Sequence, residues 1–290
     1  MTSDTGNAAH SSVAPIQAEI IQSLGVADGF DAYRELAHRS QFLADYLQAS
    51  GLRHFVVGIS GGIDSLVAGL LARSAISMLH ERGHVNAGLI AARLPYGKQM
   101  DADDAIECMD LLEPEQMLTV DIKPAADMLM QGLTQQGIRL ADAAERDVVL
   151  GNIKARQRMV ALYAVAGARA GLVVGTDHAA EDLVGYSTKF GDAAADVMPL
   201  RGLNKRRVRA LARLLDAPDS LVDKVPTADL ESLNPLRPDE EAFGVSYEEI
   251  DDFLEGKAVS AAAGQRLLQL WRAGAHKRAP AASPATLIYT

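Results

Sequence analysis

An apolar run that ends in a serine and two glycines constrains this chain more than any other feature. Residues 55–59 (Phe-Val-Val-Gly-Ile) have the apolar, β-branched composition of a buried strand, and Ser-Gly-Gly follows at residues 60–62. From Ile63 onwards, apolar residues recur at helical spacing. Because a glycine pair lets the backbone turn sharply, the stretch predicts a strand, a tight turn and a helix N-terminus.

This predicted turn has the features of an anion site. Unpaired N–H groups and the helix dipole converge at a helix N-terminus, and both favour a negative ligand. The hydroxyls of Ser60 and Ser65 can add donors, while Asp64 can cap the helix or hold a magnesium ion that bridges phosphates. The loop lacks the Gly-Lys-Ser/Thr ending of a Walker A loop. We therefore expect a phosphate site of another type, with a tight turn before a capped helix as the plainer alternative.

Charge and cysteine content exclude several classes of function. The formal net charge is −10, which argues against broad nucleic-acid binding but allows a local pocket for one small polyanion. The single cysteine, Cys108, excludes an intrachain disulfide and a Cys-rich metal site, and it suits a reducing cytoplasm. The polar start of the chain is unlike a signal peptide, and no run approaches the ~18 apolar residues of a membrane span.

The alternation of apolar runs and helical patterns predicts an α/β fold. Further strands are expected at residues 85–94, 117–122 and 172–175. Helices are expected at residues 33–47, 102–111, 146–170, 204–215, 247–254 and 266–271. Such an order predicts a doubly wound, mostly parallel sheet with helices on both faces and extra C-terminal helices. Ligands of these sheets bind beyond the carboxyl ends of the strands, where Ser60, Arg93 and Thr176 would lie.

One domain is expected over residues 15–290, because the length suits a single large domain and no internal repeat is present. The polar residues 1–14 are typical of a disordered tail. The glycine- and alanine-containing stretch at about residues 187–197 predicts a mobile loop, and the Ala-Pro-rich C-terminus predicts a mobile tail.

Several further motifs follow one another in a fixed order. They are Arg-Leu-Pro-Tyr-Gly at 93–97, Gly-Asn-Ile-Lys-Ala-Arg-Gln-Arg-Met at 151–159, Gly-Thr-Asp-His-Ala-Ala-Glu at 175–181, Ser-Thr-Lys-Phe-Gly-Asp at 187–192, Lys-Val-Pro-Thr-Ala-Asp-Leu-Glu at 224–231 and His-Lys-Arg at 276–278. Together with Ser-Gly-Gly-x-Asp-Ser, this series resembles ammonia-dependent NAD synthetase, a family of the pyrophosphate-loop ATPase superfamily. The resemblance runs from about residue 30 to residue 278 and so covers most of the chain.

The resemblance implies a fold, a reaction and an assembly. The fold would be of the adenine nucleotide α-hydrolase type. The nicotinate carboxylate of deamido-NAD would attack the α-phosphate of ATP, pyrophosphate would leave, and ammonia would displace AMP to give NAD. Magnesium is the implied cofactor, and a homodimer is the implied assembly, with the ligand near the subunit interface.

The resemblance also assigns site residues. The positions matching ATP contacts are Gly58, Ile59, Ser60, Gly61, Gly62, Ile63, Asp64, Ser65, Arg93, Gln99, Thr176, Lys205 and Thr227. The positions matching deamido-NAD contacts are Tyr46, Arg156, Lys189, Asp196, His276 and Lys277, with Tyr46 reaching the ligand of the other subunit. Asp64 and Glu181 match the magnesium ligands. No side chain is expected to act as a nucleophile, because both nucleophiles are substrates, and His178 is expected to be structural.

Three departures from the family pattern are expected to alter dinucleotide binding rather than the reaction. Tyr186-Ser187 stands where two aromatic residues are usual, and Ala193-Ala194 replaces a glycine pair. Val148 or Val149 stands where an aromatic side chain would stack on the nicotinate ring, with an expected loss of ~0.5–1.5 kcal/mol.

Two alternative functions remain open at this stage. One is another AMP-forming ligase with a pyrophosphate loop, such as a tRNA-modifying or sulfur-transfer enzyme; the acidic charge and the lone Cys108 count against it. The other is a non-catalytic adenine-nucleotide sensor, which would not need to retain Asp64, Glu181 and Lys205. A glutamine-fed synthetase would need a second catalytic module, so free ammonia is the expected nitrogen source.

Overall fold

A four-stranded parallel sheet forms the centre of the computed structural model, which describes residues 6–99, 101–227 and 233–284. The strands are β1 (His54–Gly58), β2 (Gly88–Arg93), β3 (Gln116–Thr119) and β4 (Gly171–Val174), in the order β3-β2-β1-β4. In the central register, Val56 of β1 pairs with Ile90 and with Val173. The parallel α/β prediction is confirmed, and the order reverses beside β1, where the predicted phosphate loop begins.

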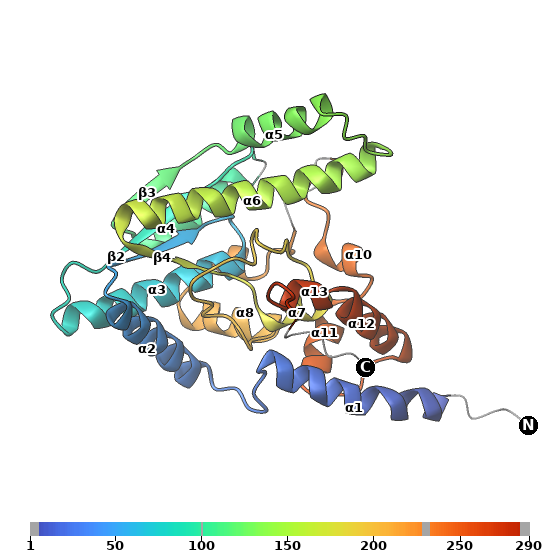
Figure 1. Ribbon diagram of the computed structural model, residues 1–290. Coiled ribbons are helices and arrows are strands. Elements are labelled where there is room, and N and C mark those ends of the chain that lie inside the picture. The colour runs from blue at the N-terminus through green and yellow to red at the C-terminus, as the bar shows by residue number, and fades with distance from the viewer. Residues whose placement is uncertain (1–5, 100, 228–232, 285–290) are drawn as a thin grey trace, which may run out of the picture.

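Helices cover both faces of this sheet (Figure 1). On one side, α3 (Ile63–Glu81) packs on β1 and β2 and contacts α2 (Ala32–Ser50), α4 (Ala102–Leu112) and α8 (Lys205–Leu214). On the other side, α6 (Ala143–Arg169) packs on β1 and β4 and carries α5 (Lys123–Gln135) on its outer surface. The two helical layers leave the carboxyl ends of the strands open to a cavity.

Helix α3 is the most apolar helix of the layer beneath the sheet. Its length and composition alone would allow it to cross a membrane, but 67% of its most apolar window is buried inside the fold. Leu66, Leu70 and Leu71 belong to the main hydrophobic core. The apolar composition of α3 is therefore explained by packing on both the sheet and the outer helices.

A second apolar cluster joins the two ends of the described chain. Helix α1 (Gly6–Leu24) lies beside α11 (Tyr247–Leu254) and α12 (Ala261–Ala273), and all three contact α7 (Ala179–Val184). Ile20, Phe253 and Leu267 are among the buried side chains of this cluster. Short helices complete the region: α9 (Asp219–Val222), α10 (Asp239–Phe243) and α13 (Ala275–Arg278).

Helix α1 differs from the disordered tail that the sequence predicted over residues 1–14. It begins at Gly6, so residues 6–14 are helical, whereas residues 1–5 lie outside the described part of the chain. The apolar side chains of Ile20 and Leu24 are buried against the C-terminal helices, which anchors the end of α1. Pro15 lies inside α1, and because proline has no backbone N–H, one helical hydrogen bond is missing at that position.

Candidate active site

The loop between β1 and α3 makes the sharp turn that the sequence predicted. Gly61 has φ +87°, in the left-handed region that favours glycine. A Cβ atom at Gly61 would also lie 2.9 Å from the backbone nitrogen of Ala105, near the start of α4. Gly62 is extended and forms the N-cap of α3 without any side-chain cap bond. Glycine at residue 61 is therefore needed both for the turn and for the close approach of α4.

The two serines of the loop bond to the loop itself. Ser60 Oγ accepts a hydrogen bond from the backbone N–H of Gly62 (3.2 Å) and lies 3.3 Å from Ser65 Oγ. Ser65 Oγ donates to the carbonyl oxygen of Gly62 (2.9 Å). These contacts hold the turn in a shape that places both hydroxyl groups along the cavity wall.

Lys224 ties this loop to the start of α4. Its ammonium lies 3.3 Å from the carbonyl oxygen of Gly61, 2.5 Å from a carboxylate oxygen of Asp104 and 3.7 Å from one of Asp101. Lys224 also lines the cavity. No local pattern predicts a role for this lysine, because its three partners lie more than a hundred residues earlier in the chain.

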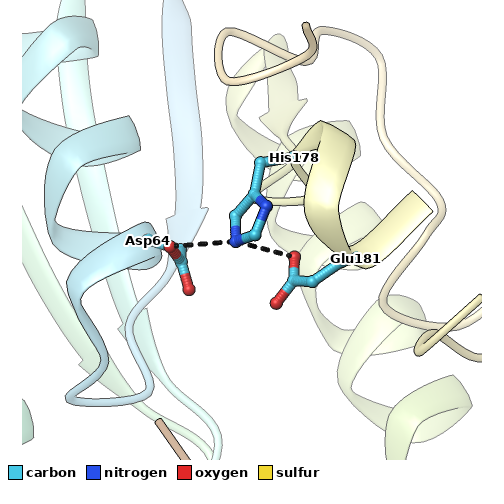
Figure 2. A group of neighbouring side chains, drawn as sticks. All are labelled: Asp64, His178 and Glu181. Atoms are coloured by element: carbon cyan, nitrogen blue, oxygen red, sulfur yellow. Dashed lines mark ion pairs between the residues drawn. The ribbon is translucent and has the colours of Figure 1, made fainter. Parts of the chain in front are cut away.

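Four charged or titratable side chains meet at the N-terminal ends of α3, α7 and α8. Asp64 lies in the first turn of α3, His178 is the N-cap of α7, and Glu181 lies in the first turn of α7 (Figure 2). Lys205, the first residue of α8, places its Nζ 2.6 Å from Oδ2 of Asp64. His178 Nε2 lies 3.4 Å from Asp64 Oδ1 and 3.6 Å from Glu181 Oε2.

The electrostatics of this group favour an additional cation. Burial and the neighbouring charge of Asp64 raise the pKa of Glu181 well above its usual value. Burial disfavours the charged form of Lys205, but attraction to Asp64 and Glu181 outweighs burial and raises the pKa of Lys205. Burial also opposes ionisation of Asp64, yet Lys205 and His178 lower its pKa. Two carboxylates thus share one ammonium, which leaves a deficit of positive charge.

A magnesium ion fits this donor set. Asp64 Oδ1 is buried and has no hydrogen-bond partner among the described residues. Asp64, His178 and Glu181 each offer one ligand atom, and these atoms lie within 4.8 Å of one another. Carboxylate oxygens are the ligands that a hard divalent cation takes from proteins. The unpartnered oxygen beside Glu181 is therefore suited to such an ion.

The loop and the charged group border one cavity of about 460 Å³ at the carboxyl ends of the strands. This volume falls within the range of small-molecule sites, roughly 300–1,000 Å³. Apolar side chains such as Leu162 and Val173 form part of the wall. Of the residues predicted to bind ATP or the metal, those that line the cavity are Gly58, Ile59, Ser60, Gly62, Ile63, Asp64, Ser65, Gln99, Thr176, Glu181, Lys205 and Thr227.

Comparison with known proteins agrees with this geometry. Residues 35–281 match the NAD synthase family. The chain is 53% identical to the NH3-dependent NAD+ synthetase of Paraburkholderia phytofirmans over 91% of this chain and 92% of that protein. The chain belongs to the NAD synthase family.

Solved structures of similar proteins carry two different names. The crystal structure of NAD+ synthetase from Burkholderia pseudomallei is 52% identical, with a TM-score of 0.80 over 92% of this chain and 97% of that chain. An NMN synthetase from Francisella tularensis is 36% identical, with a TM-score of 0.77 over 88% of this chain and 99% of that chain. The resemblance read from the motifs is thus confirmed at the level of the NAD synthase family.

Two residues of the predicted ATP set do not line the cavity. Gly61 faces the start of α4, as described above. Arg93 ends β2, and its Nε is buried with no partner among the described residues. Gly61 is part of the phosphate loop itself. Arg93 lies next to the loop in the sheet, because the carbonyl oxygen of its neighbour Ala92 accepts a hydrogen bond from the backbone N–H of Ile59. The contacts of these residues with ATP remain predictions.

Among the residues predicted to bind deamido-NAD, Lys277 lines the cavity, and three others are connected to one another by hydrogen bonds. Lys277 lines the cavity and donates to the carbonyl oxygen of Gly185 (2.8 Å). Arg156 donates to the carbonyl oxygen of Lys189 (3.2 Å), and Lys189 Nζ donates in turn to that of His276 (2.6 Å). These three residues thus form a continuous chain of contacts, although none of them lines the cavity.

Asp196 and Tyr46 lie apart from that chain of contacts. Asp196 Oδ2 accepts a hydrogen bond from the backbone N–H of Val173 (2.7 Å), which holds the predicted mobile loop against β4. Tyr46 lies on α2, 45% exposed, with its ring 6.1 Å from that of Phe42. Its expected contact with a second subunit remains a prediction, as does the mobility of residues 187–197.

The structure also shows what lies around the positions that depart from the NAD synthase pattern. Val148 lines the cavity and is 56% exposed, so an aliphatic surface faces the space where a stacking ring was expected. Tyr186 packs edge-on against Phe243, with ring centroids 4.7 Å apart. Ala194 lines the cavity as well.

Sequence reasoning missed three residues of this site. The sequence predicts a structural role for His178, places Lys224 in a motif without a role of its own, and gives no signal at Asp239. Asp239 is buried at the start of α10, lines the cavity and accepts a hydrogen bond from Tyr247 Oη (3.3 Å). The spacing of His178 and Glu181, one helical turn apart, was a usable signal; nothing local pointed to Asp239.

Proposed function

We propose that this chain catalyses the ATP-dependent amidation of deamido-NAD with ammonia, giving NAD, AMP and pyrophosphate through an adenylated nicotinate intermediate. One observation carries the proposal: the Ser-Gly-Gly-x-Asp-Ser loop and the Asp64–Lys205 pair border the same cavity. The names of the relatives at 53–55% identity support the same activity. The chain would accordingly be a C–N bond-forming ligase of NAD biosynthesis.

Each part of the site has a task in this reaction. A carboxylate is a poor electrophile, so the nicotinate group must first be activated by transfer of the adenylate from ATP. The loop amides and the N-terminus of α3 would bind the pyrophosphate that leaves. Lys205 would offset charge that develops on that leaving group, and Thr176, Gln99 and Thr227 would position ATP.

No protein nucleophile is needed, because the nicotinate carboxylate and ammonia make the two attacks. The only thiol, Cys108, is buried in the core, and burial raises its pKa to about 12. A thiol with this pKa stays protonated at neutral pH and is a weak nucleophile. The protein therefore acts by positioning substrates and by stabilising charge.

Asp64 and Glu181 would hold Mg²⁺. When bound, the ion would neutralise phosphate charge and orient the leaving group. The two carboxylates would supply its protein ligands, and Lys205 keeps Asp64 ionised by lowering the pKa of that carboxyl.

The proposal includes a cytoplasmic homodimer. Tyr46 and the exposed side of α2 would face the second subunit, where Tyr46 would reach the deamido-NAD of its partner. The half-exposed rings of Phe42 and Tyr46 lie next to each other on that side and support this orientation. Arg156, Lys189, Asp196, His276 and Lys277 would bind the same dinucleotide from within the subunit.

A product assay tests the proposed function. The protein is incubated with ATP, Mg²⁺, ammonium and either deamido-NAD or deamidated NMN, because one relative is named NMN synthetase. We expect NAD, AMP and pyrophosphate in equal amounts, with deamido-NAD strongly preferred. Formation of ADP, or nucleotide binding without AMP, would instead support another ligase or a sensor. A preference for deamidated NMN would leave the proposed ATP-dependent amidation unchanged, but it would make the mononucleotide the substrate.

A further inference from the structure

The first turn of α8, residues 205–208, consists of a lysine, two arginines and a valine. This composition is unfavourable by itself, because the N-terminal end of a helix dipole repels positive charge and leaves backbone N–H groups without helical partners. Lys205 is nevertheless the residue that α8 holds at the site, with its Nζ 2.6 Å from Asp64 Oδ2. The stabilisation of this helix end therefore has to come from neighbouring residues.

A buried carboxyl group on α11 supplies most of it. Asp251, 3% exposed, accepts hydrogen bonds from the backbone N–H of Lys205 at Oδ1 (3.0 Å) and from that of Arg206 at Oδ2 (2.7 Å). The N-cap residue Asn204 accepts the bond from the backbone N–H of Arg207 (3.0 Å). The first three N–H groups of α8 thus all have acceptors, and the one that belongs to Lys205 depends on Asp251.

The same helix also contacts the far end of the Lys205 side chain. Tyr247 precedes Asp251 by four residues, so both side chains lie on one side of α11. The Lys205 ammonium lies 5.1 Å from the centre of the Tyr247 ring, which is buried. A cation is attracted to the face of such a ring. Helix α11 therefore fixes the main chain of Lys205 through Asp251 and favours one placement of its ammonium through Tyr247.

We propose that Asp251 and Tyr247 are positioning residues that hold Lys205 where it meets the pyrophosphate leaving group. This inference rests on the role proposed above for Lys205. Neither Asp251 nor Tyr247 is among the described residues that line the cavity. Their effect on pyrophosphate therefore has to pass through Lys205, and it should vanish when the lysine is removed.

Titration calorimetry with inorganic pyrophosphate and Mg²⁺ tests this dependence in a double-mutant cycle. We expect Asp251→Asn to weaken pyrophosphate binding by about tenfold, because an amide oxygen can replace only one acceptor and the NH2 group would face the other N–H donor. In a Lys205→Met background the same change should weaken binding by less than about twofold, since the positioned group is gone. Equal losses in the two backgrounds, or unchanged affinity in Asp251→Asn itself, would overturn the proposal.

Matched variants separate positioning from a general loss of structure. Asp252→Asn is the control, because Asp252 is the next residue of α11 and pairs at the surface with Arg206 and Lys257 (3.0 Å each). This variant should bind pyrophosphate as the wild type does. A loss in Asp252→Asn as large as that in Asp251→Asn would contradict a specific role for Asp251.

Tyr247 provides a second test if Asp251→Asn does not fold by circular dichroism. Tyr247→Leu should weaken pyrophosphate binding at least about threefold when Lys205 is present, whereas Tyr247→Phe, which retains the ring, should not. Equal affinities of these two variants would count against the proposal. The calorimetry needs no deamido-NAD, while the product assay described above does, so a failure of the proposed function is distinguishable from a failure of this inference.

Discussion

Lys205 Nζ and Asp64 Oδ2 lie 2.6 Å apart, although 141 residues separate them in the chain. Lys205 is 1% exposed and Asp64 is 17% exposed, so little water screens the pair. Packing of α8 on α3 brings the two side chains together beside the phosphate loop. This contact connects the predicted phosphate loop, which carries Asp64, with Lys205, which supplies positive charge to the site.

Breaking this pair should destabilise the protein more than removing both charges. In metal-free buffer we expect Lys205→Met to lower the free energy of unfolding by about 3–5 kcal/mol, because it leaves Asp64 with an unpaired, largely buried charge. Adding Asp64→Asn should recover part of that loss. Urea unfolding of the two single variants and the double variant measures the coupling. Equal stability of Lys205→Met and the double variant would show that the pair is not coupled.

The close approach of Gly61 and α4 predicts a specific loss of ATP binding. Gly61→Ala should weaken ATP binding at least tenfold, because the new Cβ would collide with backbone at Ala105 and displace the loop. Gly137→Ala is the matched control: Gly137 also has positive φ, but a Cβ there meets nothing within 4 Å. Both variants should lose about 1–2 kcal/mol of stability from strain. Titration calorimetry with ATP should separate them; equal ATP affinities would contradict the loop assignment.

Lys224 should support the phosphate loop rather than the overall fold. We expect Lys224→Met to weaken pyrophosphate binding by about an order of magnitude, since the Gly61 carbonyl loses its donor and Asp101 and Asp104 lose their shared cation. Lys224→Arg should restore part of the affinity. Lys257→Met is a matched control, because Lys257 bridges two carboxylates on the surface. Calorimetry that finds the same pyrophosphate affinity in both methionine variants would remove Lys224 from the site.

Asp239 predicts a distinctive pH dependence of stability. Burial raises its pKa to about 6, so the folded protein retains this proton where the unfolded chain has lost it. The stabilisation from this proton is complete below about pH 4 and is lost as pH rises through about 6. Asp239→Asn should therefore gain stability relative to wild type across this window, by at most about 3 kcal/mol. Urea unfolding at pH 4.5 and pH 7.5 in metal-free buffer measures the difference.

A control with the opposite sign accompanies the Asp239 experiment. The hydrogen bond from Lys257 holds the pKa of Asp252 below its usual value. Its ionised form is therefore favoured by folding, and this stabilisation is lost as pH falls. Asp252→Asn should be less stable than wild type at pH 7.5, with a smaller difference at acidic pH. A pH-independent difference for Asp239→Asn would contradict the buried acid at α10.

Local sequence patterns were sufficient to predict the central strand of the sheet and the helix that follows it. The apolar run at residues 55–59 and the helical spacing after it located β1 and α3, because both signals depend on neighbouring residues alone. The helix expected at residues 33–47 is likewise present within α2, and Gly51 caps it in the left-handed conformation. The α1 helix escaped detection because its anchoring contacts lie with helices at the other end of the chain.

The site was harder to predict where partners are distant in sequence. Lys205 was assigned through the family resemblance, but its contact with Asp64 depends on how α8 packs on α3. Lys224 and Asp239 became visible only when the loop, α4 and α10 were assembled around one cavity. His178 was identified as a neighbour of two acids only by the orientation of α7, which no local pattern determines.

Exchange of labelled pyrophosphate into ATP tests the central claim most directly, because it isolates the step in which the loop releases and rebinds pyrophosphate. The protein is incubated with ATP, Mg²⁺, labelled pyrophosphate and deamido-NAD, with ammonia left out. We predict that label enters ATP only when deamido-NAD is present, and that Asp64→Asn abolishes the exchange. Absence of exchange in the active protein, or exchange that does not need deamido-NAD, would contradict an adenylated nicotinate intermediate at this site.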